Sequence, residues 1–421
     1  MFDWEVLTEF AQLEALAPEW DELAVANGLP MMSPACVLAW SRHLAPPTAT
    51  VRALAAFEDG RLRGLAPFYL DRNRRRLGMR LPGIELAGGL APLASPGRGR
   101  EVGEAFAGAL ASSRLCRGPI SLEGTPQALD WASGLADGWP GRLRPASRRY
   151  QVLGCPRATL EAASFEQWMS SKSANFRGSM RRLRRRFAAA GGVSRATTAA
   201  TLCEDVETFV RLHTLRWERR GGSSFMRLGP ALGAALRDIG RTQLGQEGRF
   251  RMHLLELDGA PVTAQLFLAA GGQVQYVNGG WDERFADLKP PMLAILDAIE
   301  EAFARGQSVL DLGLGEQSYK MRFADSTQNV TWDMVIPADV HLPLTLLSTA
   351  PTRGRATLRN AVKSHIPESH LTRCRRLRER VHAFERRSAA LAGRAPATPK
   401  RGRPALPDVA TSRSRLHLAE H

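Results

Sequence analysis

The side chains best suited to chemistry cluster in the second half of the chain. A short polar turn, Gly315–Lys320, follows an apolar run and places Glu316 and Lys320 at i and i+4. His213 lies earlier, on the apolar stripe of a predicted helix. A carboxylate, an ammonium group and an imidazole can transfer protons or stabilise a developing negative charge. Glu316, Lys320 and His213 are therefore the predicted catalytic residues.

Each of these residues also has a structural interpretation. Glu316 and Lys320 are predicted on one helix, where an exposed ion pair at this spacing contributes about 0.3–0.5 kcal/mol. His213 shares its stripe with Trp217, a setting that suits a buried histidine with one satisfied hydrogen bond. Asp311, just before the polar turn, either orients Lys320 or caps a turn. Both interpretations stay open from the sequence alone.

Arginine side chains supply the candidate anion-binding groups. A predicted helix over residues 173–187 carries six arginines and no acid: Arg177, Arg181, Arg182, Arg184, Arg185 and Arg186. Such a face is either solvated or binds an anionic substrate, nucleotide phosphates or an anionic membrane surface. Arg216 either grips a carboxylate or phosphate through paired hydrogen bonds or solvates its helix. Arg177, Arg181 and Arg216 are the predicted substrate-binding arginines.

Turn and periodicity signals predict the elements that position these groups. Apolar runs separated by Asp-Gly and Gly-Gly turns predict a three-strand antiparallel meander over Arg251–Leu257, Pro261–Ala269 and Gln273–Gly279. Proline at a first helical position predicts a helix from Pro290 to Gly306, and the strand Val309–Leu314 follows it. Gln265 and Tyr276 lie on the meander strands, where they either line a cleft or pack in the core.

These motifs, in this order, resemble a known family. The matching pieces are Ser173–Arg186, Leu212-His213-x-x-Arg216-Trp217, Gly279–Asp282, Pro290–Leu293 and Asp311-x-Gly-x-Gly315-Glu316-x-x-Tyr319-Lys320-x-x-Phe323. They cover roughly residues 165–325, and the set is similar to the GNAT-like domain of CelD-type acyltransferases of cellulose or exopolysaccharide biosynthesis. That type is related to the Fem-type peptidoglycan aminoacyltransferases. The first half of the chain resembles the family's degenerate first repeat more weakly.

The resemblance implies transfer of an acyl group to an amine or hydroxyl of a cell-envelope or exopolysaccharide precursor, a small-molecule or saccharide acceptor. Acetyl-CoA or another acyl-CoA is the expected co-substrate, and no metal is implied. In this fold the third and fourth strands splay apart, and the donor pairs with exposed backbone of the third. The residues implied on the donor side are Tyr276, Asn278, Gly279, Arg284 and Lys289. Those implied on the acceptor side are Arg177, Arg181, Arg216, Trp217, Gln265, Asp311 and Tyr319.

One departure from the family pattern concerns the donor phosphates. Acetyl-CoA enzymes of this fold use a glycine-rich turn at the start of the helix, whose N–H groups bind the pyrophosphate. Here the segment Trp281–Pro291 ends in two prolines, which lack those N–H groups. Arg284 or Lys289 would have to replace them. Otherwise the donor is a different one, such as the aminoacyl-tRNA of Fem-type enzymes.

The first half repeats part of the second. Asp59–Leu70 echoes Asp258–Leu268, since a hairpin turn leads into an apolar strand in both. We therefore predict an α+β (mixed α/β) fold with tandem GNAT-like domains. The predicted boundaries are 1–160 for a degenerate first domain, 161–340 for the acyltransferase domain, 341–392 for a basic helical extension and 393–421 for a disordered tail.

The charge distribution bears on partners. The chain has a net charge of +15, from 57 basic and 42 acidic residues. Residues 341–421 hold 17 basic and 5 acidic residues, a net of +12, so the other 340 residues are nearly neutral at +3. A basic tail with one aromatic residue predicts peripheral contact with an anionic membrane or a polysaccharide-synthase complex, and no specific nucleic acid. A non-catalytic scaffold attached in this way is an alternative to an enzyme.

Cysteine usage and hydropathy bear on the compartment. The five cysteines are widely spaced and form no CxxC pair, which favours a reducing environment without a disulfide framework. The chain has no run of eighteen apolar residues, and its first residues lack the basic region of a secretion signal. These features predict a cytoplasmic protein, with the option of attachment to the inner face of the membrane.

Overall fold

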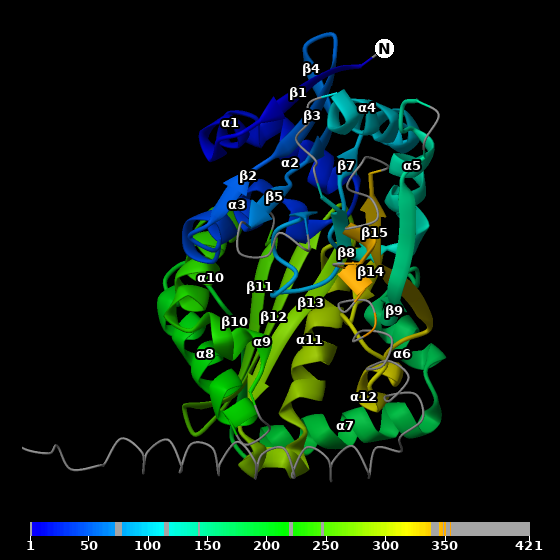
Figure 1. Cartoon of the computed structure of the whole chain (residues 1–421). Coiled ribbons are helices and arrows are strands. Elements are labelled where there is room, and N and C mark those ends of the chain that lie inside the picture. The colour runs from blue at the N-terminus through cyan, green and yellow to red at the C-terminus, as the bar shows by residue number, and fades with distance from the viewer. Residues whose placement is uncertain are drawn as a thin grey trace, which may run out of the picture. The chain divides into compact units, whose positions relative to one another are not determined.

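A computed structural model describes residues 2–71, 78–112, 118–141, 144–218, 222–245 and 248–337, together with 345–347, 349–350 and 354. In these residues helices pack on two sheets, one of eleven strands and one of four (Figure 1). The fold is mixed α+β, as predicted. The predicted extension and tail fall almost entirely outside the described residues.

The second half is built on the predicted meander. Strands β11 (Phe250–Leu257), β12 (Ala260–Ala270) and β13 (Gln273–Trp281) are antiparallel. Helix α11 (Pro290–Ala304) then returns the chain, and β14 (Val309–Asp311) pairs parallel to β13. The sequence prediction is confirmed, except that β14 ends three residues earlier than the predicted Leu314.

Alternating side chains bury both faces of this meander. On β12, Leu266 and Leu268 belong to the core formed with α8 (Leu202–Glu218) and α10 (Pro230–Gln243). Their neighbours Phe267 and Ala269 belong to the core formed with α11. Strand side chains point alternately to opposite faces, so one strand contributes to two helical layers. Figure 1 shows α8 and α10 beside the sheet and α11 in front of it.

The first half repeats the same plan. Strand β6 (Met79–Arg80) pairs parallel to β8 (Ile120–Pro126), with α4 (Gly99–Ser112) between them in the sequence. Each arm of the hairpin that turns at Asp59 is divided into two strands. The first arm is β2 (Ala49–Val51) and β3 (Ala53–Glu58), and the second arm is β4 (Arg61–Ala66) and β5 (Tyr69–Asp71). Strands β3 and β4 join β1 (Asp3–Leu7) and β7 (Leu93–Ala94) in the smaller sheet, whereas β2 and β5 join the larger one.

The two halves exchange their last strands. The large sheet has the order β10-β11-β12-β13-β14-β9-β15-β8-β6-β5-β2. Strand β9 (Ala146–Thr159) closes the first half but pairs with β14 of the second. Strand β15 (Ser326–Ile336) closes the second half but pairs with β8 of the first. Strands β9 and β15 also pair with each other, so the order reads symmetrically about their junction.

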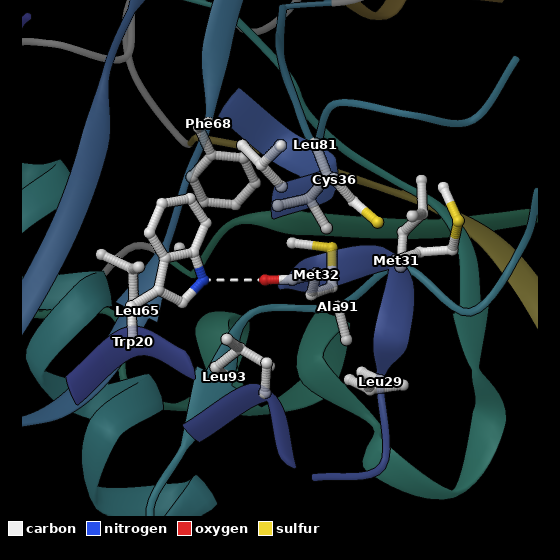
Figure 2. Packing of buried hydrophobic residues seen from close by; sticks show 14 of the residues in the cluster. Trp20, Leu29, Met31, Met32, Cys36, Leu65, Phe68, Leu81, Ala91 and Leu93 are labelled. Carbon is white, nitrogen blue, oxygen red and sulfur yellow. Dashed lines mark hydrogen bonds between the residues drawn. The ribbon is translucent and has the colours of Figure 1, made fainter. Parts of the chain in front are cut away.

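One hydrophobic core crosses the boundary between the halves. Trp20 on α2 (Ala17–Ala26) is fully buried, and its Nε1 donates to the carbonyl oxygen of Met32 at 2.7 Å (Figure 2). Met32 ends η1 (Pro30–Met32), which leads into helix α3 (Pro34–His43). The same apolar cluster continues into side chains of α8, α10, β11 and β12.

Of the strands longer than two residues, three were not predicted from the sequence. Strands β9, β15 and β10 (Gly192–Ala196) were missed. Residues 84–86 form a turn, although Ile84 and Leu86 at alternate positions favour a short strand. Cys36, Cys155 and Cys203 are free thiols. In the described residues, no helix is long and apolar enough to cross a membrane.

Candidate active site

The opening between β13 and β14 is the centre of the candidate site. The two strands pair only where Gln273–Gln275 face Val309–Asp311, yet β13 continues to Trp281. The backbone of β13 beyond Gln275 therefore has no β14 partner. Helix α8 lies so close to this backbone that a Cβ added at Gly280 would be 2.2 Å from the backbone nitrogen of His213. This is the splay that the resemblance implied.

His213 is buried beside this opening, with 2% of its surface exposed. Its Nδ1 lies 3.1 Å from the carbonyl oxygen of Gly279 and its Nε2 lies 2.7 Å from Ser223 Oγ. A carbonyl only accepts, so Nδ1 carries the hydrogen and Nε2 accepts from the serine hydroxyl. Burial lowers the pKa of His213 to about 4, and the Arg216 charge acts in the same direction. The imidazole is therefore neutral near pH 7.

Ser223 was missed in the sequence. It is the N-cap of α9 (Ser224–Leu228), where Oγ accepts the Met226 N–H at 3.2 Å. Its position directly after the Gly221-Gly222 pair is a helix-start signal. Helical spacing does not connect it with His213, because α8 ends at Glu218, before Ser223.

The Arg216 guanidinium lies near two indole rings. Its guanidinium carbon is 5.5 Å from the Trp217 ring centroid and 5.9 Å from that of Trp281. Arg216 Nε and Trp217 Nε1 are buried without a hydrogen-bond partner in the described residues. Burial raises the pKa values of Tyr276 and Tyr319, and the Arg216 charge opposes both shifts. The guanidinium thus acts electrostatically on His213, Tyr276 and Tyr319.

A buried hydrogen-bond chain links β12 to β13. Tyr276 Oη donates to Gln265 Oε1 at 2.9 Å, and Gln265 Nε2 donates to Thr263 Oγ1 at 2.7 Å. Thr263 Oγ1 then donates to the Gly280 carbonyl oxygen at 2.9 Å. Because every donor in this hydrogen-bond chain has an acceptor, these bonds hold β13 in place where β13 faces His213. Gln265 and Tyr276 are both buried, which supports the core interpretation, and the cleft interpretation stays a prediction.

Lys320 is on the short helix α12 (Ser318–Met321) and is 4% exposed. Its Nζ donates to the carbonyl oxygens of Gly313 at 3.2 Å and Leu314 at 2.9 Å. The ammonium group also lies 5.9 Å from the Tyr276 ring centroid. Burial lowers the pKa of Lys320 to about 8, although Cys155 and Asp311 act in the opposite direction. The structural interpretation, in which Lys320 is an exposed side chain, is therefore wrong.

Asp311 caps the turn that precedes Lys320. Its Oδ1 accepts the Gly313 N–H at 2.7 Å, and its Oδ2 lies 3.2 Å from Arg157 Nε on β9. Of the two predicted roles, turn capping is the one that direct hydrogen bonds support. The positive φ of Gly313 (74°) allows this turn to approach Tyr276, whose carbonyl oxygen would lie 2.9 Å from an added Cβ.

The predicted i,i+4 helical pair of Glu316 and Lys320 is wrong. Helix α12 begins only at Ser318, because Gly315 has a φ of 92° and Gln317 is extended. Glu316 is exposed, and in the described residues it forms no ion pair with Lys320. Its carboxylate instead lies against β9, because a Cβ added to Gly154 would be 2.8 Å from Glu316 Oε1.

The predicted donor-side residues do not form an anion cradle. Asn278 Oδ1 accepts the Gly279 N–H at 2.9 Å, and the exposed Arg284 is paired with Asp282 at 2.6 Å. Lys289 is exposed and forms the N-cap of α11 with a φ of 47°. Pro290 and Pro291 lack N–H groups, and the Met292 N–H donates to the Lys289 carbonyl oxygen at 2.9 Å. The start of α11 therefore offers no amide to a pyrophosphate at its first three positions.

The arginine helix α7 (Ala174–Ala189) is partly paired. Arg184 forms ion pairs with Asp297 at 2.9 Å and Glu300 at 2.5 Å, both on α11. Helix α11 therefore supplies the acidic partners that α7 itself lacks. Arg177 donates to the carbonyl oxygens of Ser170 and Lys172 at the end of α6 (Phe165–Ser171). Arg181 is exposed. Within the described residues, neither Arg177 nor Arg181 contacts His213, Arg216 or Lys320.

No metal site accompanies these groups in the described part of the chain. There, no cluster of three or more His, Cys, Asp or Glu side chains could hold a metal ion.

Comparisons with known proteins bear on the fold. Residues 174–321 match a family model described as an acetyltransferase (GNAT) domain. The fold is similar to the crystal structure of FemX, with a TM-score of 0.56 and 12% identity over 82% of this chain and 99% of that one. No curated protein matches the sequence.

Two further solved structures are more distant. The C-terminal domain of a putative lysylphosphatidylglycerol synthetase from Agrobacterium fabrum has a TM-score of 0.48 and 10% identity, over 80% of this chain and 96% of that one. A tandem GNAT protein from the clavulanic acid biosynthesis pathway has a TM-score of 0.44 and 14% identity, over 80% and 100%. The chain thus has a mixed α+β, GNAT-like fold, and its residues 174–321 match a GNAT acetyltransferase domain model.

Proposed function

We propose that this protein transfers an acyl group, with acetyl-CoA as donor, to an amine or hydroxyl of a cell-envelope or exopolysaccharide precursor. One observation carries the proposal: a neutral, buried histidine and an arginine with no acidic partner among the described residues border the open backbone of β13. Acyl transfer needs a proton acceptor beside the attacking group and a positive charge beside the carbonyl oxygen. His213 and Arg216 supply these two groups.

The free backbone of β13 accounts for donor binding in this proposal. An extended pantetheine arm, or another extended donor, adds to β13 as a further strand would, through main-chain hydrogen bonds beyond Gln275. Arg216 then lies where negative charge develops on the carbonyl oxygen. Lys320 holds the turn at Gly313 and Leu314, and so keeps the β14 side of the opening in place.

The start of α11 limits how a CoA donor is held. Side-chain cations must replace the missing amides, and Lys289 is the exposed cation at this helix start. An aminoacyl ester of tRNA is the alternative donor, because its phosphates do not require a helix terminus. The fold likeness to FemX is compatible with either donor.

Donor choice is tested by calorimetry of the full chain with acetyl-CoA and, in parallel, with a charged tRNA. We expect acetyl-CoA to bind with a micromolar to millimolar dissociation constant, the usual range for enzyme substrates. Thiol release in the presence of amino sugars and short saccharides would then identify the acceptor class. Absence of acetyl-CoA binding at millimolar concentration, together with binding of charged tRNA, would replace the donor assignment.

A further inference from the structure

We propose that α7 binds the phosphate groups of the acyl donor, with Arg182 and Arg186 in place of the amides that the start of α11 lacks. The inference rests on the proposed function for its ligand, the phosphates of an acyl-CoA, and adds a binding site to it. Three observations support this site: the segments that α7 connects, the arginines that lack acidic partners, and the spacing of these arginines.

Helix α7 connects the two sides of the opening between β13 and β14. Segment η4 (Glu283–Leu288) follows β13, and Arg186 Nη1 lies 3.5 Å from the carbonyl oxygen of Asp287 in this segment. Near the other end of α7, the Phe176 ring contacts Phe323, which follows α12, with ring centroids 5.3 Å apart. Figure 1 shows α12 beside α7. Helix α7 therefore lies across the open end of the splay.

This position is where the phosphates of a bound donor are expected. A donor that adds to β13 beyond Gln275 leaves the opening at its open end, because pairing with β14 closes the other end. The open end leads to η4 and then to Pro290, where α11 begins without amide donors. Arg186 is the side chain of α7 that already reaches this segment.

The two proposed arginines have no acidic partners in the described part of the chain. Arg182 and Arg186 are exposed, and no ion pair of either is present there. Arg184 lies two residues from each of them, and so on the opposite side of the helix. It pairs with Asp297 and Glu300 of α11. The acids that neutralise α7 are thus on one side of the helix, and the charge on the other side is available to a ligand.

The spacing of Arg182 and Arg186 suits a shared anion. They are four residues apart on α7, so their side chains project from the same side of the helix. Like charges at this spacing destabilise a helix, and an anion between them removes the repulsion. Each guanidinium group can bind a phosphate through paired hydrogen bonds. A phosphate ligand therefore accounts for two neighbouring charges that the fold itself does not use.

The packing of α7 disfavours a membrane as the occupant. Its apolar side chains, which an inserted amphipathic helix would place in the lipid, are buried in the protein: Phe176, Met180, Leu183 and Phe187. Only ionic contacts with lipid headgroups would be left. The position across the opening favours the donor instead.

Calorimetry of the full chain with CoA and with pantetheine tests the site, because pantetheine has the arm of CoA without the phosphates of the nucleotide. We expect the wild type to bind CoA more tightly than pantetheine. The double variant Arg182→Gln/Arg186→Gln should weaken CoA binding by about 10- to 100-fold and leave the affinity for pantetheine unchanged. Its melting temperature should equal or exceed that of the wild type, because two like charges are removed.

Arg100→Gln is the matched control. Arg100 is an exposed helical arginine of the first half and pairs with Glu104, both on α4. This variant should bind CoA as the wild type does.

Wild-type CoA affinity in the double variant would overturn the inference and leave the proposed acyl transfer intact. If that variant then bound phosphatidylglycerol vesicles more weakly, α7 would be assigned to a membrane. A wild type that binds charged tRNA and not CoA would replace the proposed donor. In that case, reduced tRNA affinity in the double variant would keep α7 as the phosphate site, and unchanged tRNA affinity would overturn the site as well.

Discussion

His213 has a low pKa for a histidine at a proposed transfer site. Burial among Phe209, Trp217 and Phe225 disfavours the charged imidazole, and its pKa falls to about 4. The base is thus neutral over the whole physiological range. We expect kcat/KM to keep its neutral-pH value on acidification until the pH approaches about 4. A pH–rate profile measures this directly, and an acidic limb at the ordinary value of 6.5 would contradict it.

Lys320 makes stability depend on pH in the alkaline range. Its pKa is lowered from 10.5 to about 8, so the unfolded chain binds more protons than the native one between these values. The free energy of unfolding therefore rises with pH across this window. Relative to Lys320→Met, the wild type should gain at most about 3 kcal/mol. Urea unfolding of both proteins at pH 8 and pH 10.5 tests this, and a constant difference between them would refute it.

At the scale of elements, the contact between α8 and β13 positions the site. Gly280 permits this contact because it has no side chain. A Cβ added there would lie 2.2 Å from the backbone nitrogen of His213 and 2.5 Å from the Leu212 carbonyl carbon. Both atoms are backbone and cannot move without the helix. We expect Gly280→Ala to cost about 3 kcal/mol or more of unfolding free energy and to abolish transfer.

Gly178→Ala is the control for that change. Gly178 is exposed on α7, and nothing lies within 4 Å of an added Cβ. Alanine is favoured over glycine inside a helix, so this variant should be stabilised by about 0.5–1 kcal/mol with unchanged activity. Thermal melts of the two variants separate a steric effect from a general intolerance of alanine.

Local elements were predictable to the extent that their signals are local. Proline at the start of α11 and the Asp-Gly and Gly-Gly turns predicted the meander, the helix and the strand after it correctly. Glu316 was misplaced because the glycine backbone at residue 315 delays α12 to Ser318, and helical spacing alone does not reveal that delay. The long strands β9 and β15 were missed although they pair along most of their length.

At the scale of the molecule, the exchanged strands make the halves interdependent. Strand β9 pairs with β14 and β15, and the core of the first half continues into α8, α10 and β12. We expect residues 1–337 to unfold in a single transition, with tryptophan fluorescence and circular dichroism giving coincident curves. Two separated transitions would show that the halves are independently stable.

The basic segment after residue 341 is proposed to attach the enzyme to an anionic surface. Its net charge of +12 exceeds that of all preceding residues together. Deleting residues 342–421 should leave transfer unchanged and remove binding to phosphatidylglycerol vesicles, which in the full chain should weaken as salt rises. Phosphatidylcholine vesicles are the control. Equal vesicle binding by both chains would contradict the proposal.

The sequence by itself determined the α+β pattern, the order of the motifs, the charge of the tail and the absence of amides at the start of α11. Each depends on residues close together in the chain, so residue type and spacing are sufficient evidence. Only the tertiary structure decided that Arg184 meets acids of α11, that the halves exchange strands, and that Ser223 meets His213. These contacts join segments that no local periodicity connects, and burial then sets the protonation of the groups they bring together.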